Sequence, residues 1–140
     1  MKIKARFVTP VSFWEKVSTY EAGKGNTTEW VLYTEGAQFI FPCEWRGKFG
    51  YGKFGNAIFE ADAEGVLDRA TIRMPFIPCL YDKLRTSAVV VIKGMDGNAI
   101  KDGEPDPANP NVYEVYGGVD NIYEENQYME FHCHRYEVTG

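Results

Sequence analysis

The sequence predicts an all-β fold: a small single-domain β-barrel or sandwich of about six to eight short antiparallel strands with long protruding loops. Three observations predict it. The chain has nine tyrosines and nine phenylalanines but few leucines, which favours strands over helices. Several short stretches alternate between apolar and polar residues, the period of a half-buried strand. Gly, Pro, Asn and Asp gather between these stretches, as they do in turns. A length of 140 residues fits one domain, residues 1–140.

Strand-like segments follow one another through the first part of the chain. Residues 2–7 alternate strictly, and Pro10 is expected to end that strand. Residues 11–33 are interpreted as strand, loop and strand around the breaker "AGKGNTT", with a short helix as the alternative for the first of these. The next extended segment, 37–49, contains Pro42, which indicates an edge position or a bulge.

The second half contains the clearest patterns. Residues 70–75 alternate, 79–87 favour one short turn of helix, and the β-branched run within 88–94 predicts the most buried strand. Two more strands are expected within 112–126 and 127–138. The predicted inward-facing sets are Ala70, Ile72 and Met74 in one strand and Met129, Phe131 and Cys133 in another.

Two segments rich in glycine and proline interrupt the strands. Gly94–Asn111 is too rich in breakers for regular structure, and Gly47–Gly55 reads "GKFGYGKFG". Loops on a rigid scaffold are where binding concentrates, so both segments are expected to contact partners. The candidate partner-binding residues are Lys48, Phe49, Tyr51, Lys53, Phe54, Asp96, Asp102, Pro105 and Pro107.

The segment "GKFGYGKFG" has the glycine and lysine spacing of a phosphate-binding loop. Phe54 stands where such a loop needs Ser or Thr, and no strand–helix–strand context surrounds it, so phosphate binding is disfavoured. A glycine-framed arm whose aromatics bind a neighbouring protein fits better. Two alternatives remain open: the aromatics fold back on their own barrel, or they stack on single-stranded bases in an OB-like barrel that binds nucleic acid or another ligand.

The segment "FHCHR" holds both histidines of the chain and one of its three cysteines. Side chains alternate along a strand, so Cys133 is expected to point away from His132 and His134. A closed zinc site needs about four ligands, and we expect no metal, no cofactor and no catalytic residue. A site made by the two histidines with Glu130, and a small barrel enzyme using Cys133 or the histidines, remain as alternatives. The wide cysteine spacing indicates buried free thiols rather than disulfides.

Charge and hydropathy narrow the function classes. The net charge of −5 and a pI of about 5.1 disfavour a surface dedicated to nucleic acid. The first ten residues contain no long apolar run, so we expect neither a signal peptide nor a membrane anchor. We therefore expect the protein to be made and kept in a cytoplasm.

The order of strands in the second half resembles the small head–tail joining proteins of tailed bacteriophages, which include head completion, stopper and minor capsid proteins. The likeness covers roughly residues 66–136. In that family an A-x-I-x-x-P strand precedes a strand that leads into a glycine, followed by a Y-x-V strand with a V-D-N continuation and a final strand carrying M-E. The matching residues are Ala70, Ile72, Pro75, Gly94, Tyr113, Val115, Val119, Asp120, Asn121, Met129 and Glu130.

This resemblance implies a structural virion protein without enzyme activity or cofactor. It implies a β-barrel subunit that assembles as a homo-oligomeric ring in the neck of the virion, between the portal or its adaptor and the tail, after synthesis in the host bacterial cytoplasm. DNA would pass through the lumen without specific binding, and an acidic chain is compatible with that because like charge removes the phosphate attraction. No membrane is implied. The segments Gly47–Gly55 and Gly94–Asn111 are the expected contacts with neighbours.

Overall fold

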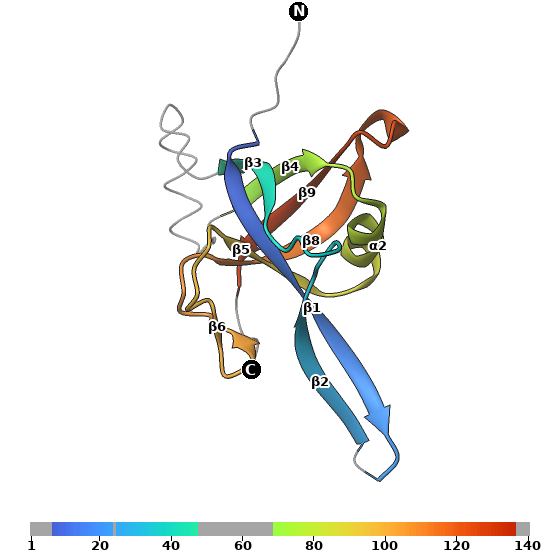
Figure 1. Ribbon diagram of the computed structural model, residues 1–140, viewed down its shortest axis with the longest axis vertical. Coiled ribbons are helices and arrows are strands. Elements are labelled where there is room, and N and C mark those ends of the chain that lie inside the picture. The colour runs from blue at the N-terminus through green and yellow to red at the C-terminus, as the bar shows by residue number, and fades with distance from the viewer. Residues whose placement is uncertain (1–6, 24, 48–68, 137–140) are drawn as a thin grey trace, which may run out of the picture.

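A computed structural model describes residues 7–23, 25–47 and 69–136 (Figure 1). Its principal element is one seven-stranded antiparallel sheet in the order β2-β1-β3-β4-β9-β8-β5. The last strand, β5, pairs again with β1, so the sheet curls round on itself, and the all-β prediction is confirmed. The strands of this sheet are β1 (Thr9–Glu21), β2 (Gly25–Leu32), β3 (Phe41–Gly47), β4 (Arg69–Pro75), β5 (Val89–Lys93), β8 (Val112–Asn121) and β9 (Tyr128–Arg135).

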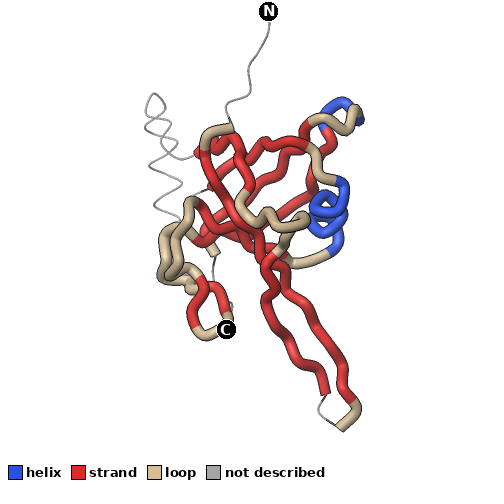
Figure 2. Tube along the Cα trace, viewed as in Figure 1, coloured by secondary structure: helices blue, strands red, loops and turns tan. Residues whose placement is uncertain are grey.

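The remaining elements are short. They are the helix α2 (Pro78–Thr86), the two-residue strands β6 (Ile100–Lys101) and β7 (Glu104–Pro105), and the 3-10 turn η2 (Ile122–Glu124). Strands dominate the molecule, and α2 lies against one side of the curled sheet (Figure 2). Among the described helices, none is long and apolar enough to cross a membrane.

The strand β1 belongs to two parts of the molecule. Its first half closes the curled sheet, because Thr9–Val11 pairs with β3 and Val11–Glu15 pairs with β5. Its second half, from Trp14 to Glu21, pairs with β2. The strand therefore continues past the barrel as a two-stranded ribbon, which projects from one end of the molecule (Figure 1). The predicted order of strand, loop and strand over 11–33 is confirmed, and the helical alternative is wrong. The loop is shorter than predicted, because β2 begins at Gly25 and includes the last four residues of the breaker "AGKGNTT".

The core lies inside the curl and is built by alternation. The rings of Phe41 and Phe131 both lie against Phe13, with centroids 5.9 and 6.0 Å away. Each of these rings is almost fully buried, and burial of such a side chain is worth about 1.5–3 kcal/mol. The inward sets predicted for β4 and β9 are confirmed, since Ala70, Ile72, Met74, Met129, Phe131 and Cys133 are all buried.

The helix α2 closes one side of the core, and the predicted short helix is confirmed. Pro78 stands in its first turn, where a missing N–H costs no hydrogen bond. Leu80 and Leu84 are four residues apart, so they share one helix face, and both are buried in the main core cluster. The strand β5 has four consecutive buried residues, which fits its prediction as the most buried strand.

Two proline predictions need correction. Pro10 does not end a strand but lies second in β1, and the strand predicted over 2–7 falls almost wholly outside the described residues. The strand β3 is not an edge strand, since it lies between β1 and β4. Pro42 lies opposite Pro10, and the pairing of β3 with β4 begins only at Glu44. The missing N–H of Pro42 therefore falls where no ladder partner is required, which gives a local edge within an internal strand.

The cysteines divide differently from the prediction. Cys43 and Cys133 are buried free thiols, as expected, but Cys79 is exposed in the first turn of α2. The spacing of the cysteines could not predict that Cys79 lies on the face of α2 that points away from the core. On β9, Cys133 lies in the core while His132 and His134 lie on the other face, so the predicted alternation of this segment is confirmed.

Candidate interaction surfaces

The loop Gly94–Asn111 is folded on itself, which corrects the prediction that it lacks regular structure. Ile100 pairs with Pro105 and Lys101 with Glu104, so β6 and β7 form a small hairpin. Asp102 lies in the turn of this hairpin with a φ of 55°, followed by a glycine at 81°. Asp and Gly tolerate this left-handed conformation better than other residues, so the breaker residues here shape a tight turn rather than an open chain.

The carboxylate of Asp96 holds the ends of this loop together. Asn109 Nδ2 donates to Asp96 Oδ2 at 2.8 Å, and Asn111 Nδ2 donates to the same oxygen at 3.1 Å. The backbone N–H of Asn98 donates to Asp96 Oδ1 at 2.8 Å. The hydrogen bonds from Asn109, from the Asn98 amide and from Asn111 lower the pKa of Asp96, so the carboxylate stays ionised.

The structure places the four predicted residues of this loop in different surroundings. Asp102 and Pro107 are exposed, and the Pro107 carbonyl accepts a 3.5 Å hydrogen bond from Arg135 Nη2. Asp96 is partly exposed, whereas Pro105 is buried within the subunit and is closed to a partner. The other five candidates lie outside the described residues: Lys48, Phe49, Tyr51, Lys53 and Phe54.

An apolar pocket of about 370 Å³ lies between the root of the ribbon and the start of this loop. Trp14 and Leu32, which are paired across β1 and β2, form its ribbon side. The rim carries Phe39, 46% exposed, and Met95, 73% exposed. Ser12 and Asp96 are the polar residues among those that line the pocket. A concave apolar site with few polar groups is the usual form of a binding pocket.

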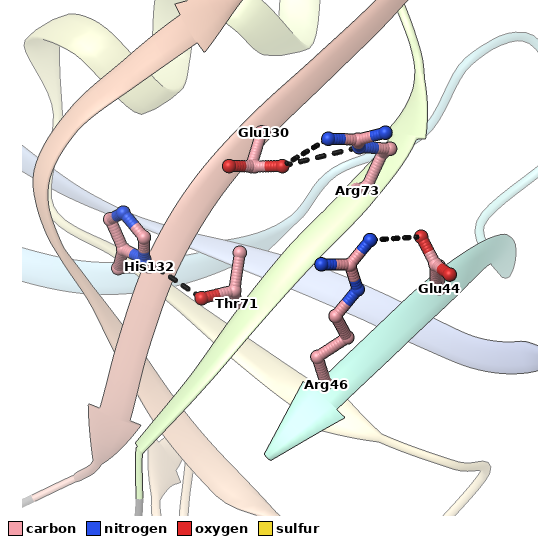
Figure 3. A network of polar contacts seen from close by, with 6 residues as sticks. All are labelled: Glu44, Arg46, Thr71, Arg73, Glu130 and His132. Carbon is pink, nitrogen blue, oxygen red and sulfur yellow. Dashed lines mark hydrogen bonds and ion pairs between the residues drawn. The ribbon is translucent and has the colours of Figure 1, made fainter. Parts of the chain in front are cut away.

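A polar network covers the outer face of β3, β4 and β9 (Figure 3). Arg73 Nε and Nη2 both donate to Glu130 Oε1, at 3.1 and 2.9 Å. On the neighbouring strand, Arg46 Nη2 donates to Glu44 Oε1 at 3.5 Å. Thr71 Oγ1 and His132 Nδ1 lie 3.1 Å apart across β4 and β9. The two arginines in Figure 3 are therefore each paired with a glutamate, one across β4 and β9 and the other two residues away within β3.

The second histidine belongs to the same face but to a different group. His134 Nδ1 lies 2.9 Å from the Arg135 carbonyl oxygen and 3.9 Å from Glu114 Oε1. The ring of Tyr116 lies against His134, with centroids 4.9 Å apart. Within the part of the chain that the structure describes, no group of three or more His, Cys, Asp or Glu side chains is arranged to hold a metal ion. Packing and pairing account for both histidines in this geometry.

The ribbon of β1 and β2 offers a third surface. Lys16, Ser18 and Tyr20 lie on one face, and this face is continuous with Trp14 at the pocket. Tyr20 is 71% exposed close to the outer end. Along this ribbon, the strand pairing among the described residues is confined to β1 with β2. The backbone groups on the outer edge of β2 are thus open to another strand.

The sequence did not identify the pocket or the ribbon face. Trp14, Phe39 and Met95 come from three separate segments, and only closure of the sheet brings them together. One signal was present: Met95 and Ile100 are large apolar residues within a loop that is otherwise polar.

Comparison with known proteins gave no matching family model, no similar curated protein and no similar solved structure.

Proposed function

We propose that this chain is a structural virion protein, a head completion or stopper subunit that joins the head of a tailed bacteriophage to its tail as a ring of copies. The single observation that carries the proposal is the ribbon of β1 and β2, which leaves the barrel with its outer edge and Tyr20 open. The resemblance of residues 66–136 to the head–tail joining proteins supplies the class of assembly.

A projecting two-stranded ribbon is unfavourable for an isolated subunit, both for its own stability and for its solubility. Such a ribbon is marginally stable in water on its own, and an open strand edge invites pairing with other chains. An adjacent subunit relieves both problems, because it covers Tyr20 and supplies a strand or loop along the edge of β2. A ring subunit makes such head-to-tail contacts repeatedly until the circle closes.

The partners in this proposal are other copies of the chain, the portal or adaptor protein on one side and tail proteins on the other. DNA passes through the lumen without specific binding. The acidic loop Gly94–Asn111 supports this part of the proposal, since its four carboxylates outnumber its one lysine and would repel a phosphate backbone.

The test uses the full chain, alone and with a portal complex, by sedimentation and electron microscopy. We expect rings for the wild type. We expect Tyr20→Asp to weaken assembly by about 30-fold or more, because a buried aromatic at an interface contributes about 2 kcal/mol or more. Tyr123→Asp is the matched control, since Tyr123 is also highly exposed but lies in η2, away from the ribbon. A chain that stays monomeric with and without the portal, and never enters particles, would contradict the proposal.

A further inference from the structure

We propose that the apolar pocket beside Asp96 receives a Lys-Phe pair from the segment 48–54 of a second copy of this chain. The inference rests on the proposed function and deepens it, because it joins the two segments that were expected to contact neighbours. The phenylalanine ring enters the pocket, and the lysine lies at the acidic side of its mouth. Shape, charge and chain length each support this occupant.

The pocket has the size and lining for an aromatic ring. A cavity of about 150 Å³ lined by aliphatic and aromatic side chains can bind benzene, and this pocket has a volume of about 370 Å³. Trp14 and Ile92 are among its apolar lining residues, and Phe39 and Met95 add apolar surface that is exposed to solvent. A phenylalanine that enters from another chain would cover these two rim residues, which the subunit itself leaves exposed.

Charge favours an occupant that carries lysine. Asp96 lines the pocket, and its loop also carries Asp102, Glu104 and Asp106 against the single cation Lys101. The segment "KFGYGKF" has the opposite character, since each of its two phenylalanines directly follows a lysine and it contains no acidic residue. An aromatic inserted in an apolar pocket, with an ion pair at the rim, is the common form of an interface hot spot.

Chain length allows the segment to reach a neighbouring subunit. It begins directly after Gly47, the last residue of β3, and the chain returns to the barrel at Arg69. An extended residue spans about 3.3 Å, so a connection of this length reaches about 30 Å from its two ends. A reach of this length is long enough for the segment to extend beyond its own subunit.

The first experiment mixes two full-length variants and measures mass by sedimentation. The first variant, Met95→Lys, keeps the segment but places a positive charge at the pocket rim, where it repels the lysine of the entering Lys-Phe pair. The second variant, Phe49→Ser with Phe54→Ser, keeps the pocket but removes the two phenylalanines that would enter it. We expect each variant alone to assemble about tenfold more weakly than wild type, and the mixture to form a pair that neither forms alone. Val8→Lys is the matched control, because Val8 is 74% exposed, like Met95, and does not line the pocket.

The second experiment measures the contact directly, with a labelled peptide GKFGYGKFG and fluorescence anisotropy. The full-length Phe49→Ser/Phe54→Ser chain should bind this peptide, and should bind GKSGYGKSG at least about tenfold more weakly. Adding Met95→Lys to that chain should reduce binding by a similar factor, whereas adding Val8→Lys should not. High salt should also weaken binding, because the ion pair at the rim is exposed to screening.

The outcomes separate this inference from the proposed function. Peptide binding that is absent, or unchanged by Met95→Lys, overturns the pocket assignment even if the wild type forms rings. A mixture of the two variants that remains unpaired shows that the segment does not act between copies, and this also overturns it. If the peptide binds as expected but the wild type stays monomeric, the pocket assignment stands and the ring is contradicted.

Discussion

Lys83 on α2 donates a 2.8 Å hydrogen bond from Nζ to Oε1 of Glu15, the last residue of β1 that pairs with β5. Ser87 Oγ donates to the other carboxylate oxygen of Glu15 at 2.7 Å. The Lys16 N–H donates to the Ala88 carbonyl at 2.9 Å immediately beyond. One carboxylate therefore ties the end of the helix to the root of the ribbon, and this fixes the direction in which the ribbon leaves the barrel.

The first prediction concerns the stability that this contact supplies. Glu15→Gln removes the charge that both donors face, and we expect the free energy of unfolding to fall by about 1 kcal/mol, a charge-assisted value reduced for the partial exposure of Lys83. Urea unfolding at pH 7 measures it. Glu29→Gln, an exposed carboxylate on the same ribbon, serves as the control and should leave stability unchanged. Equal effects of the two substitutions would show that the Glu15 contact is not specific.

The second prediction concerns the pH dependence of the same contact. Burial raises the pKa of Glu15, but hydrogen bonds from Lys83 and Ser87 and the Lys83 charge bring it below the usual 4.5. The hydrogen bond to Glu15 raises the pKa of Lys83 above 10.5, despite partial burial. Stability from a lowered carboxyl pKa is present above 4.5 and is lost as the pH falls through the folded-state value. Stability from a raised lysine pKa is present below 10.5 and is lost as the pH rises through its folded-state value.

The difference in stability between wild type and Glu15→Gln should therefore be constant at neutral pH and should shrink at both extremes. Unfolding curves between pH 3 and pH 11 measure this difference directly. A difference that instead grows below pH 4.5, the usual pKa of the carboxyl, would contradict the assignment of the pair.

The third prediction concerns the three hydrogen bonds that the Asp96 carboxylate accepts within its loop. Asp96→Asn replaces an acceptor of three donors with a side chain that is itself partly a donor, so we expect the amide of Asn98 to lose its protection from hydrogen exchange. The amides of β5 should keep theirs, because that strand is held by pairing on both sides. Asp102→Asn, in the exposed turn of the same loop, is the control and should change neither. Retention of the Asn98 protection in Asp96→Asn would show that the loop is held by its backbone alone.

Local patterns in the sequence predicted local structure well. Alternation at Ala70, Ile72 and Met74 gave the correct inward face of β4, because a half-buried strand imposes its period directly on the residue types. The edge position predicted from Pro42 is correct only locally, because the rule for proline concerns one missing hydrogen bond, and an internal strand such as β3 also has positions without a ladder partner.

Features that depend on closure of the sheet were beyond local patterns. The pocket joins Trp14 to Met95 only because β5 returns to β1, and that pairing cannot be read from either strand alone. The same holds for the ribbon, whose length is set by where β5 begins, at Val89 opposite Glu15. The candidate residues at 48–54 lie outside the described residues, and their role stays a prediction.

The fourth prediction concerns the thiols. Burial raises the pKa of the Cys43 thiol to about 12, and burial together with the nearby Cys43 raises the pKa of Cys133. The thiolate is the reactive form, so both should be inert in the folded protein, while the exposed Cys79 should react. Titration with a thiol reagent at pH 8 should give one fast group in the folded chain and three after unfolding. Cys79→Ser should abolish the fast group, and two fast groups in the wild type would show that the barrel opens at Cys43 or Cys133.

The fifth prediction separates the stability of the barrel from the function of the ribbon. Phe131 is fully buried against Phe13, so Phe131→Ala leaves a cavity in the core and should cost about 3–5 kcal/mol. Tyr20→Ser on the ribbon should change the unfolding free energy of the dispersed subunit by less than about 0.5 kcal/mol, because the ring is already in water. Denaturant unfolding at low protein concentration measures both. A large loss of unfolding free energy from Tyr20→Ser under those conditions would mean that the tyrosine stabilises its own subunit. That result would contradict the assignment of the ribbon as a surface that contacts a neighbouring subunit.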